Sequence, residues 1–155
     1  MLPFLLMLAA QAATDKLPKA QALPPPVGDE QSVLSSANAL LSAFNTGNST
    51  EILRWVYPEG RVTGTGTFPN RSGLRSESWT QFMQRLGTNS FQETISDPAV
   101  EVDGDAAMIW APFVVRVGGK VSNCGIDHFD LVRENGSWKV MNLTFSSRIA
   151  GCPAQ

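Results

Sequence analysis

The side chains that could carry out chemistry gather in the stretch 121–133 of this 155-residue sequence, and Asp127 is the leading candidate acid. A carboxyl group buried in the middle of a strand can have a raised pKa, and in its protonated form it can polarise the carbonyl group of a ligand. The same carboxyl group can instead hydrogen-bond Thr144, Asn142 or a backbone amide and stabilise a sheet. The residue types leave three roles open for Asp127: structural partner, ligand contact and acid catalyst.

Several aromatic residues lie where they could surround this acid. An aromatic wall with a few polar groups is typical of a small-molecule site, although aromatic residues of a small domain are also often plain core. The expected strand pairing places Trp110 and Thr144 next to Asp127, all on one face of a sheet. We therefore expect a ligand-binding site formed by Trp110, Asp127, Phe129, Asn142, Thr144, Trp55 and Tyr57.

His128 is the single histidine. No cysteine or carboxylate flanks it at the spacing of metal ligands, so we expect no metal and no cofactor. A catalytic dyad of Cys124 and His128 fails on geometry, because four residues of a strand separate them by about 13 Å. We expect His128 to lie in the core or in a subunit interface.

The N-terminal residues are typical of an export signal. Residues 1–13 hold a short apolar core followed by small residues that suit a signal peptidase, although no lysine or arginine precedes the core. Residues 14–28 are polar and rich in proline, which indicates an extended linker. We expect an exported protein, periplasmic or secreted, without a membrane span; a buried N-terminal helix is the alternative.

The two cysteines are consistent with export. An even pair of cysteines in an exported protein predicts a disulfide, here between Cys124 and Cys152. Closing a loop of this length stabilises a protein by about 3–4 kcal/mol in the chain-entropy description. In a cytosolic protein the same residues would be inert buried thiols.

Length and charge limit the classes of function. The chain suffices for one globular domain, which we place at 29–152. Its net charge is −2, with acids and bases mixed and no basic stripe to neutralise phosphates, so we expect no nucleic-acid partner.

Hydrophobic spacing predicts three helices, followed by a run of strands. The helices begin near Asp29, Ser49 and Ser76 or Ser78, and they end at Gly47, Tyr57 and Gly87. A first strand is expected over 61–67, a polar loop over 68–75, and four further strands over 90–102, 105–117, 120–133 and 137–148. Turn dipeptides such as Asp103-Gly104 and Gly118-Gly119 join these four strands into an antiparallel meander. Helices first and a meander afterwards predict an α+β domain.

Both faces of the expected sheet are apolar, so neither should lie simply in water. Three helices can cover only one face of such a sheet. A second copy of the chain is the simplest cover for the other face, and we therefore expect a homodimer.

The hairpins contain an ordered set of motifs: 102–106, Trp110-Ala111-Pro112, Cys124-Gly125-Ile126-Asp127, 129–132 and 136–140. In this order the motifs resemble the lumazine-binding group of the nuclear transport factor 2-like (SnoaL-like) superfamily, and the similarity extends from about Asp29 to Cys152. The resemblance implies a cone: a curved antiparallel sheet, covered by three N-terminal helices, around a cavity (the cystatin-like or nuclear transport factor 2-like fold).

The resemblance also bears on activity. Asp127 lies where the ketosteroid isomerase branch of the superfamily has a hydrogen-bonding acid, but Thr65 and Leu40 occupy the places of that branch's general base and phenol and can do neither task. Members of the group often have a histidine where this chain has Asn123, so no imidazole role carries over. We expect a non-catalytic binder of a small apolar or aromatic molecule. The alternatives are an isomerase or dehydratase that uses Asp127 as acid, and a dimeric protein-interaction module without a ligand.

Overall fold

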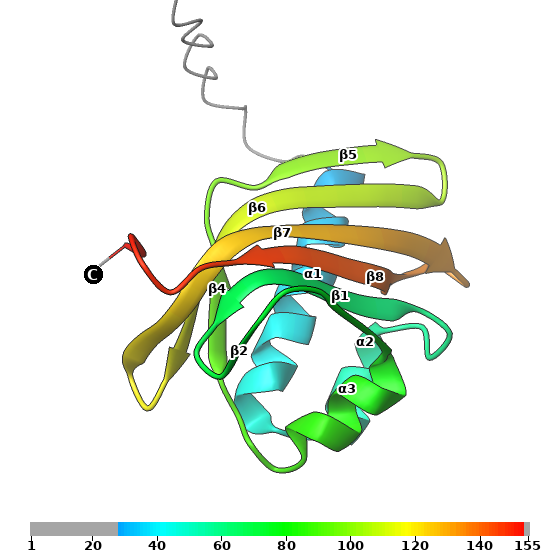
Figure 1. Cartoon of the computed structure of the whole chain (residues 1–155). Helices are drawn as coiled ribbons and strands as arrows, with labels where there is room; N and C mark the ends of the chain where they lie inside the picture. Colours follow the sequence, from blue (N-terminus) through cyan, green and yellow to red (C-terminus); the bar gives the residue numbers. More distant parts are fainter. Residues whose placement is uncertain (1–27, 154–155) are drawn as a thin grey trace, which may run out of the picture.

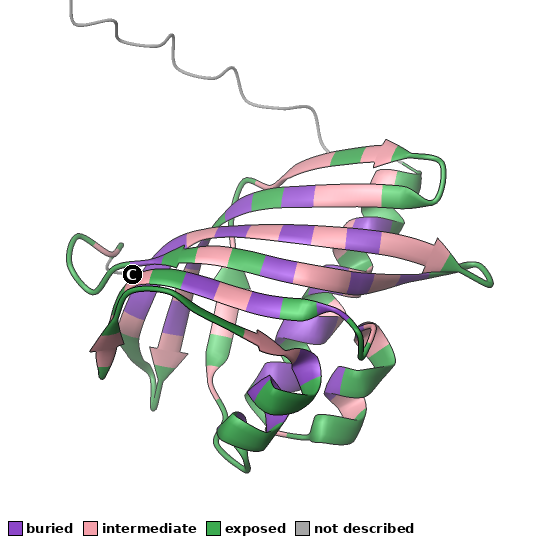
Figure 2. Ribbon diagram, turned by 45° about the vertical axis from the view of Figure 1, so that its right-hand side comes forward, coloured by how far each residue is buried: buried purple, intermediate pink, exposed green. Residues whose placement is uncertain are grey.

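The computed structural model describes residues 28–153 of the chain. The expected signal peptide (1–13) and residues 14–27 of the expected linker lie outside the described residues. Three helices and an eight-stranded sheet form the α+β architecture that the sequence predicts. The helices gather on one side of the curved sheet (Figures 1 and 2).

The helices begin and end close to the predicted positions. Helix α1 spans Asp29–Thr46, α2 spans Ser49–Trp55 and α3 spans Trp79–Leu86. Ser78 caps α3 in a capping box with Gln81, and Gly47 ends α1 in the left-handed conformation. Asp29 does not cap α1 as its side chain would allow; it lies in the first turn, after Gly28. None of the helices within residues 28–153 is long and apolar enough to span a membrane.

The strands form one mixed sheet in the order β2-β1-β8-β7-β6-β4, with β3 paired to β1 and β5 paired to β6. The pairing between named strands is antiparallel except between β1 and β8, which run parallel, so the sheet is mixed at this pair and not antiparallel throughout as expected. The strands are β1 Arg61–Phe68, β2 Arg71–Ser72, β3 Arg75–Ser78, β4 Gln92–Ile95, β5 Ala99–Asp103, β6 Ala106–Val117, β7 Lys120–Glu134 and β8 Ser137–Ser147.

Two predicted segments differ in detail. The single strand expected over 90–102 is divided into β4 and β5 by a break at 96–98, and both parts pair with β6 one after the other. The loop expected over 68–75 contains β2 and the start of β3, which fold back along β1. The sheet therefore continues over the segment that follows β1.

Two β-bulges change which side chains share a face of the sheet. Between β6 and β7 the pairing moves from Arg116–Val121 to Val115–Asn123, which leaves Ser122 as an extra residue. Between β7 and β8 it moves from Leu131–Val140 to Asp130–Asn142, which leaves Met141 as an extra residue. A shift of one residue moves every later side chain to the opposite face. Along the middle of these strands, Asp127 of β7 therefore shares a face with Ala111 of β6, whereas an ideal hairpin would place it beside Trp110.

The core fills the space between the sheet and the helices. The concave face contributes alternate residues of each strand, as the bands of burial in Figure 2 show. Ile109, Phe129 and Leu143 are buried there against Leu40 and Phe44 of α1. Gly125 permits the close approach of β7 and β8, because a Cβ atom at this position would collide with the carbonyl oxygen of Ser146.

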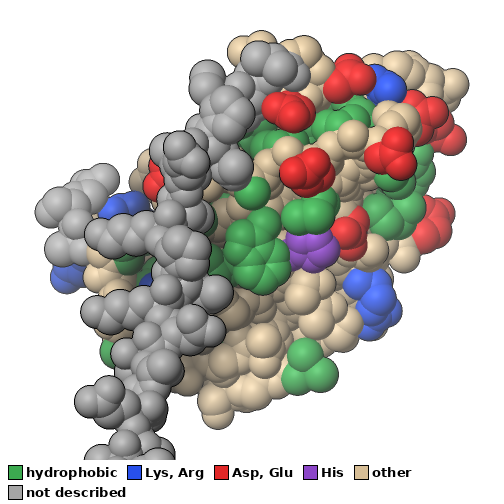
Figure 3. Space-filling view, turned by 90° about the horizontal axis from the view of Figure 1, so that it is seen from above, with side chains coloured by type: hydrophobic (Ala, Val, Ile, Leu, Met, Phe, Trp, Pro, Cys, Tyr) green, Lys and Arg blue, Asp and Glu red, His purple; other side chains and the backbone are tan. Residues whose placement is uncertain are grey.

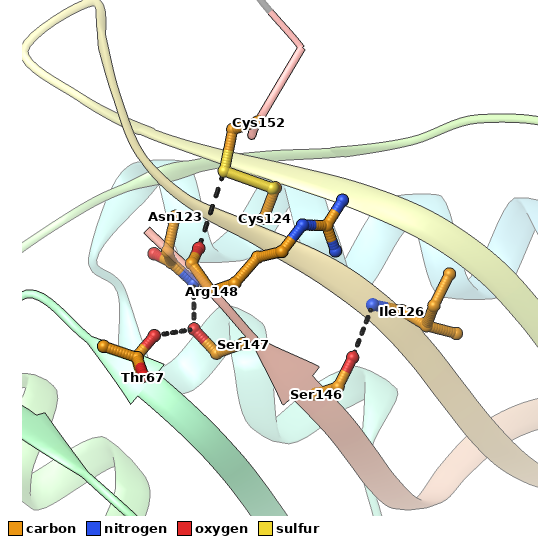
Figure 4. Close-up of a disulfide and its surroundings, with 8 residues drawn as sticks. All are labelled: Thr67, Asn123, Cys124, Ile126, Ser146, Ser147, Arg148 and Cys152. Atoms are coloured by element: carbon orange, nitrogen blue, oxygen red, sulfur yellow. Dashed lines mark hydrogen bonds between the residues drawn. A yellow bond between two sulfur atoms is a disulfide. The ribbon is translucent and has the colours of Figure 1, made fainter. Parts of the chain in front are cut away.

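The predicted disulfide between Cys124 and Cys152 is present. It joins Cys124, near the start of β7, to the segment after β8, as Figure 4 shows. Beside it, Asn123 donates a hydrogen bond to Oγ of Ser147 (3.1 Å), and Ser147 donates to the carbonyl oxygen of Thr67 (2.9 Å). These bonds hold the ends of β1, β7 and β8 together near Cys124.

Candidate functional site

A cavity of about 380 Å³ lies between the concave face of the sheet and the helices. This volume is in the range of small-molecule sites. Six phenylalanines form much of the wall, and the polar lining comes from two carboxyl groups, three guanidinium groups and two amides. The aromatic side chains are Phe44, Phe68, Phe82, Phe91, Phe113 and Phe145, and the charged ones are Glu93, Asp127, Arg71, Arg75 and Arg85.

Glu93 and Asp127 form a pair of carboxyl groups inside this cavity. Asp127 is 1% exposed on β7, and Glu93 reaches it from β4. Their side chains are hydrogen-bonded to one another. No N–H or O–H group of another residue within 28–153 donates to Oδ2 of Asp127 or Oε1 of Glu93. Two carboxyl groups can hydrogen-bond only if at least one of them holds a proton.

The curvature of the sheet brings the two acids together. Glu93 pairs with Val115 of β6, whereas Asp127 pairs with Ala111 of the same strand. In a flat sheet four residues along a strand would separate these positions by about 13 Å. The curvature of β6 and β7 along their length, visible in Figure 1, closes this gap on the concave side. The bulge at Ser122 is equally necessary, because it turns Asp127 toward that side.

Burial raises the pKa of both acids. For Asp127 the pKa lies well above the usual range, because burial disfavours its charged form and the negative charge and hydrogen bond of Glu93 act in the same direction. Burial also raises the pKa of Glu93, to about 7, although its hydrogen bond with Asp127 opposes this shift. Because the pKa of each acid is raised, the folded protein favours a proton shared between the two carboxyl groups.

The prediction that Trp110 and Asp127 share a face is wrong. Trp110 pairs directly with His128, and both side chains point to the convex face, away from the cavity. Trp110 is 51% exposed, and its ring centroid lies 5.9 Å from that of His128. Thr144 pairs with His128 on the other side and is also exposed, so it cannot be the hydrogen-bond partner of Asp127. The two bulges are the reason, because each shifts the pairing by one residue.

The remaining residues of the predicted ligand site also lie outside the cavity wall. Phe129 shares the concave face with Asp127 but is fully buried in the core. Trp55 packs against the core from α2, and the hydroxyl group of Tyr57 donates to Glu134 at 2.8 Å. Asn142 accepts from the backbone N–H of Arg61 at 3.0 Å. Of the seven predicted residues, Asp127 alone lines the cavity.

Sequence reasoning overlooked Glu93, although the sequence contains a signal for it. In β4 the residues alternate between exposed and half-buried, and Glu93 is half-buried between Phe91 and Ile95 in this alternation. An acid in line with two apolar residues of a strand predicts a carboxyl group that faces the core. Arg71 and Arg75 lie in the segment expected to be a polar loop, where nothing marked them as cavity residues.

The convex face is the second notable surface. Figure 3 looks onto it and shows the histidine beside a group of hydrophobic side chains with acidic side chains around them. Nε2 of His128 lies 3.5 Å from Oδ1 of Asp130. No group of three or more histidine, cysteine, aspartate or glutamate side chains suited to a metal ion occurs between residues 28 and 153.

Solved structures of other proteins share the overall fold of this chain. An NTF2-like protein from Cytophaga hutchinsonii matches with a TM-score of 0.66 and 11% identity, over 79% of this chain and all (100%) of the other. A dehydratase candidate of the NTF2-like family from Streptomyces avermitilis matches with a TM-score of 0.61 and 19% identity, over 79% of this chain and 97% of the other. The CaMKII hub of S. rosetta matches with a TM-score of 0.61 and 23% identity, over 79% and 99%.

Comparisons of sequence add no family. No family model matches the chain, and no curated protein matches it. The likeness in structure therefore establishes the fold alone, and a proposal about activity has to be argued from the residues of the cavity. This chain has the nuclear transport factor 2-like fold, which is also called cystatin-like.

Proposed function

We propose that this protein binds a small, largely apolar or aromatic molecule in the cavity on the concave side of the sheet, without transforming it. The observation that carries the proposal is the contrast within the cavity wall: six phenylalanines surround one pair of proton-sharing acids. Apolar walls with a few convergent polar groups favour binding of a flat molecule in one orientation.

The acid pair defines what the bound molecule must offer. With Glu93 protonated, the pair has an O–H group free to donate to a carbonyl or hydroxyl oxygen. With Glu93 ionised, the pair only accepts, and it suits a hydroxyl or N–H group. A hydroxyl group on the ligand can both donate and accept, so it suits the pair whether Glu93 is protonated or ionised. It would also give a hydrogen-bond partner to Oδ2 of Asp127 or Oε1 of Glu93, which is unfavourable to bury without one.

Thermal-shift and calorimetric titrations against flat hydroxylated heterocycles and naphthols test this proposal. We expect at least one compound to raise the Tm of the parent protein, and Asp127→Asn to weaken its binding by about tenfold. Trp110→Ala is the matched control, since Trp110 lies on the opposite face and its loss should leave the affinity unchanged. If no compound in the panel binds, or if Trp110→Ala weakens binding as much as Asp127→Asn, the cavity is not the binding site.

Acid–base catalysis is the second candidate, and the presence of Glu93 favours it. An isomerase or dehydratase that used Asp127 as acid would need another titratable group in the same cavity, and Glu93 is such a group. The ionised carboxylate of Glu93 could remove a proton from a carbon next to a carbonyl, while Asp127 stabilises the oxygen that becomes negative. The match to a dehydratase candidate is consistent with this chemistry.

Proton exchange separates the two candidates. A binder leaves the C–H groups of a bound ketone unchanged in D2O, whereas an isomerase-type site exchanges them for deuterium. We expect the parent protein to exchange these C–H groups no faster than the Asp127→Asn variant does. Exchange that requires both Glu93 and Asp127 would instead establish the enzyme.

We also propose that the protein is exported and forms a homodimer. The apolar start followed by a proline-rich segment supports export, as does the disulfide. The half-exposed Trp110, Ile126 and His128 on the convex face support pairing with a second copy. Membership in the lumazine-binding group rests on the hairpin motifs, and we infer no lumazine ligand from it.

A further inference from the structure

Three arginines line the cavity at the end formed by β2, β3 and α3. Arg71 belongs to β2, Arg75 begins β3 and Arg85 lies in the last turn of α3. The guanidinium group of Arg71 lies flat over the ring of Phe68, with its carbon 3.5 Å from the ring centroid. Its Nη1 also donates to the carbonyl oxygen of Gly73 at 3.1 Å. Arg71 is therefore held in place against the cavity wall before any ligand arrives.

The positive charge at this end is only partly balanced. Arg85 is paired with Glu77, whose Oε1 accepts from Nε at 3.0 Å. Arg71 and Arg75 have no carboxylate partner within residues 28–153. Burial lowers the pKa of Arg71, and the neighbouring charges of Arg75 and Arg85 lower it further. The guanidinium remains protonated in water, so an anion placed here would relieve a repulsion that already exists.

The acid pair disfavours an anion at its own place in the cavity. Burial raises the pKa of both Glu93 and Asp127, and ionisation of Glu93, whose pKa is about 7, gives the pair a negative charge. A second anion beside it would meet repulsion in surroundings of low polarity. Neither Glu93 nor Asp127 forms an ion pair with these arginines, and six phenylalanine rings line the same cavity. The cavity therefore has a cationic end, an apolar body and an acid pair that prefers an uncharged polar group.

We propose that the ligand is an amphipathic monoanion, a class that deepens the proposed function and rests on it. Its carboxylate or sulfate group contacts Arg71 and Arg75, and its flat apolar body lies among the phenylalanines. An uncharged hydroxyl or carbonyl group reaches Glu93 and Asp127. Arginine is suited to this task because its planar donors match two oxygens of such an anion at once.

Matched pairs of compounds test this assignment. The probes are 6-hydroxy-2-naphthoate and a hydroxyindole carboxylate, each beside its methyl ester, titrated into the full domain by calorimetry. The ester keeps the ring system and the hydroxyl group, removes the charge and adds one methyl group. We expect each acid to bind the parent about ten- to a hundredfold more tightly than its ester, with the difference shrinking at high salt.

Arginine variants show which side chains cause the preference for the acid over its ester. Arg71→Gln and Arg75→Gln should each reduce the preference for the acid over the ester, and the double variant should abolish it while ester binding persists. Arg54→Gln is the matched control, because Arg54 is exposed on α2, pairs with Glu51 and does not line the cavity. A circular dichroism melt of each variant confirms folding.

The outcomes separate this inference from the proposed function. If esters bind as tightly as acids, or if Arg71→Gln and Arg75→Gln leave the preference unchanged, the anionic class is wrong although the protein remains a binder. If neither acids nor esters nor the neutral panel bind, the proposed function itself fails.

Discussion

The carboxyl groups of Glu93 and Asp127 hydrogen-bond one another although their strands, β4 and β7, are separated in the sheet by β6. This contact depends on the bend of β6 and on the bulge at Ser122, so it is a product of the sheet's shape and not of neighbouring positions in the sequence. The energetic cost of burying two acids is reduced when they share a proton.

The first prediction concerns stability against pH. Because the pKa of folded Glu93 is about 7 and that of an ordinary glutamate 4.5, the folded state binds more protons between these values. Stability should therefore fall as the pH rises through this window, by up to about 3 kcal/mol from Glu93 alone, with a further loss from Asp127. Urea unfolding from pH 4.5 to 8 measures this loss.

Variants of the pair provide the control for this prediction. Glu93→Gln should make the decline with pH about half as steep, and Glu93→Gln combined with Asp127→Asn should remove it. Parent stability that is level or rising from pH 4.5 to 7 would contradict a buried pair with raised pKa values.

A second prediction concerns the disulfide. Replacing both Cys124 and Cys152 by alanine should lower the free energy of unfolding by about 3–4 kcal/mol, because the unfolded chain regains the freedom of a loop with a sequence separation of 28 residues. Guanidinium unfolding with and without reductant measures the effect, and reductant should not change the double variant. A parent protein whose mass does not increase by two hydrogens on reduction would show that the bridge is not formed.

A third prediction tests the close approach of β7 and β8. Gly125→Ala should destabilise the protein by about 3 kcal/mol or more, since the new methyl group collides with a backbone carbonyl that cannot move alone. Gly104→Ala is the comparison: its φ is 57° and no atom lies within 4 Å of the added Cβ, so it should cost only about 1 kcal/mol. Equal costs in thermal unfolding would mean that the strands are not in contact there.

A fourth prediction concerns the convex face. If a second copy covers it, Trp110→Glu should convert a dimer into a monomer, because a charge in an apolar interface is unfavourable. Sedimentation velocity distinguishes the two states. Leu74→Glu, at a 73% exposed position of the turn between β2 and β3, should leave the dimer intact. A parent protein that sediments as a monomer would exclude the dimer.

The elements of the fold could be predicted from the sequence because local signals mark them. Ser78 and Gly47 lie at helix ends, and glycine turns such as Gly118-Gly119 mark the hairpins. The disulfide could be predicted as well, since only two cysteines are present.

The candidate site could be predicted only in part. The sequence indicates Asp127, but the bulges at Ser122 and Met141 have no mark in the sequence as distinct as a turn glycine, and each inverts the faces beyond it. Ideal hairpins therefore place Trp110 and Thr144 beside Asp127, whereas in the structure they flank His128. Glu93 lies on β4, which does not pair with β7, and only the bend of the sheet brings Glu93 close to Asp127.

The most direct test of the acid pair is a carbon-13 NMR titration of the side-chain carboxyl carbons of Glu93 and Asp127. The structure predicts that Glu93 titrates with a pKa of about 7 and that the pKa of Asp127 lies well above its usual range. Each titration should change when the other residue is replaced by its amide. Two independent titrations near pH 4 would contradict the pair and remove the basis for a binding site in this cavity.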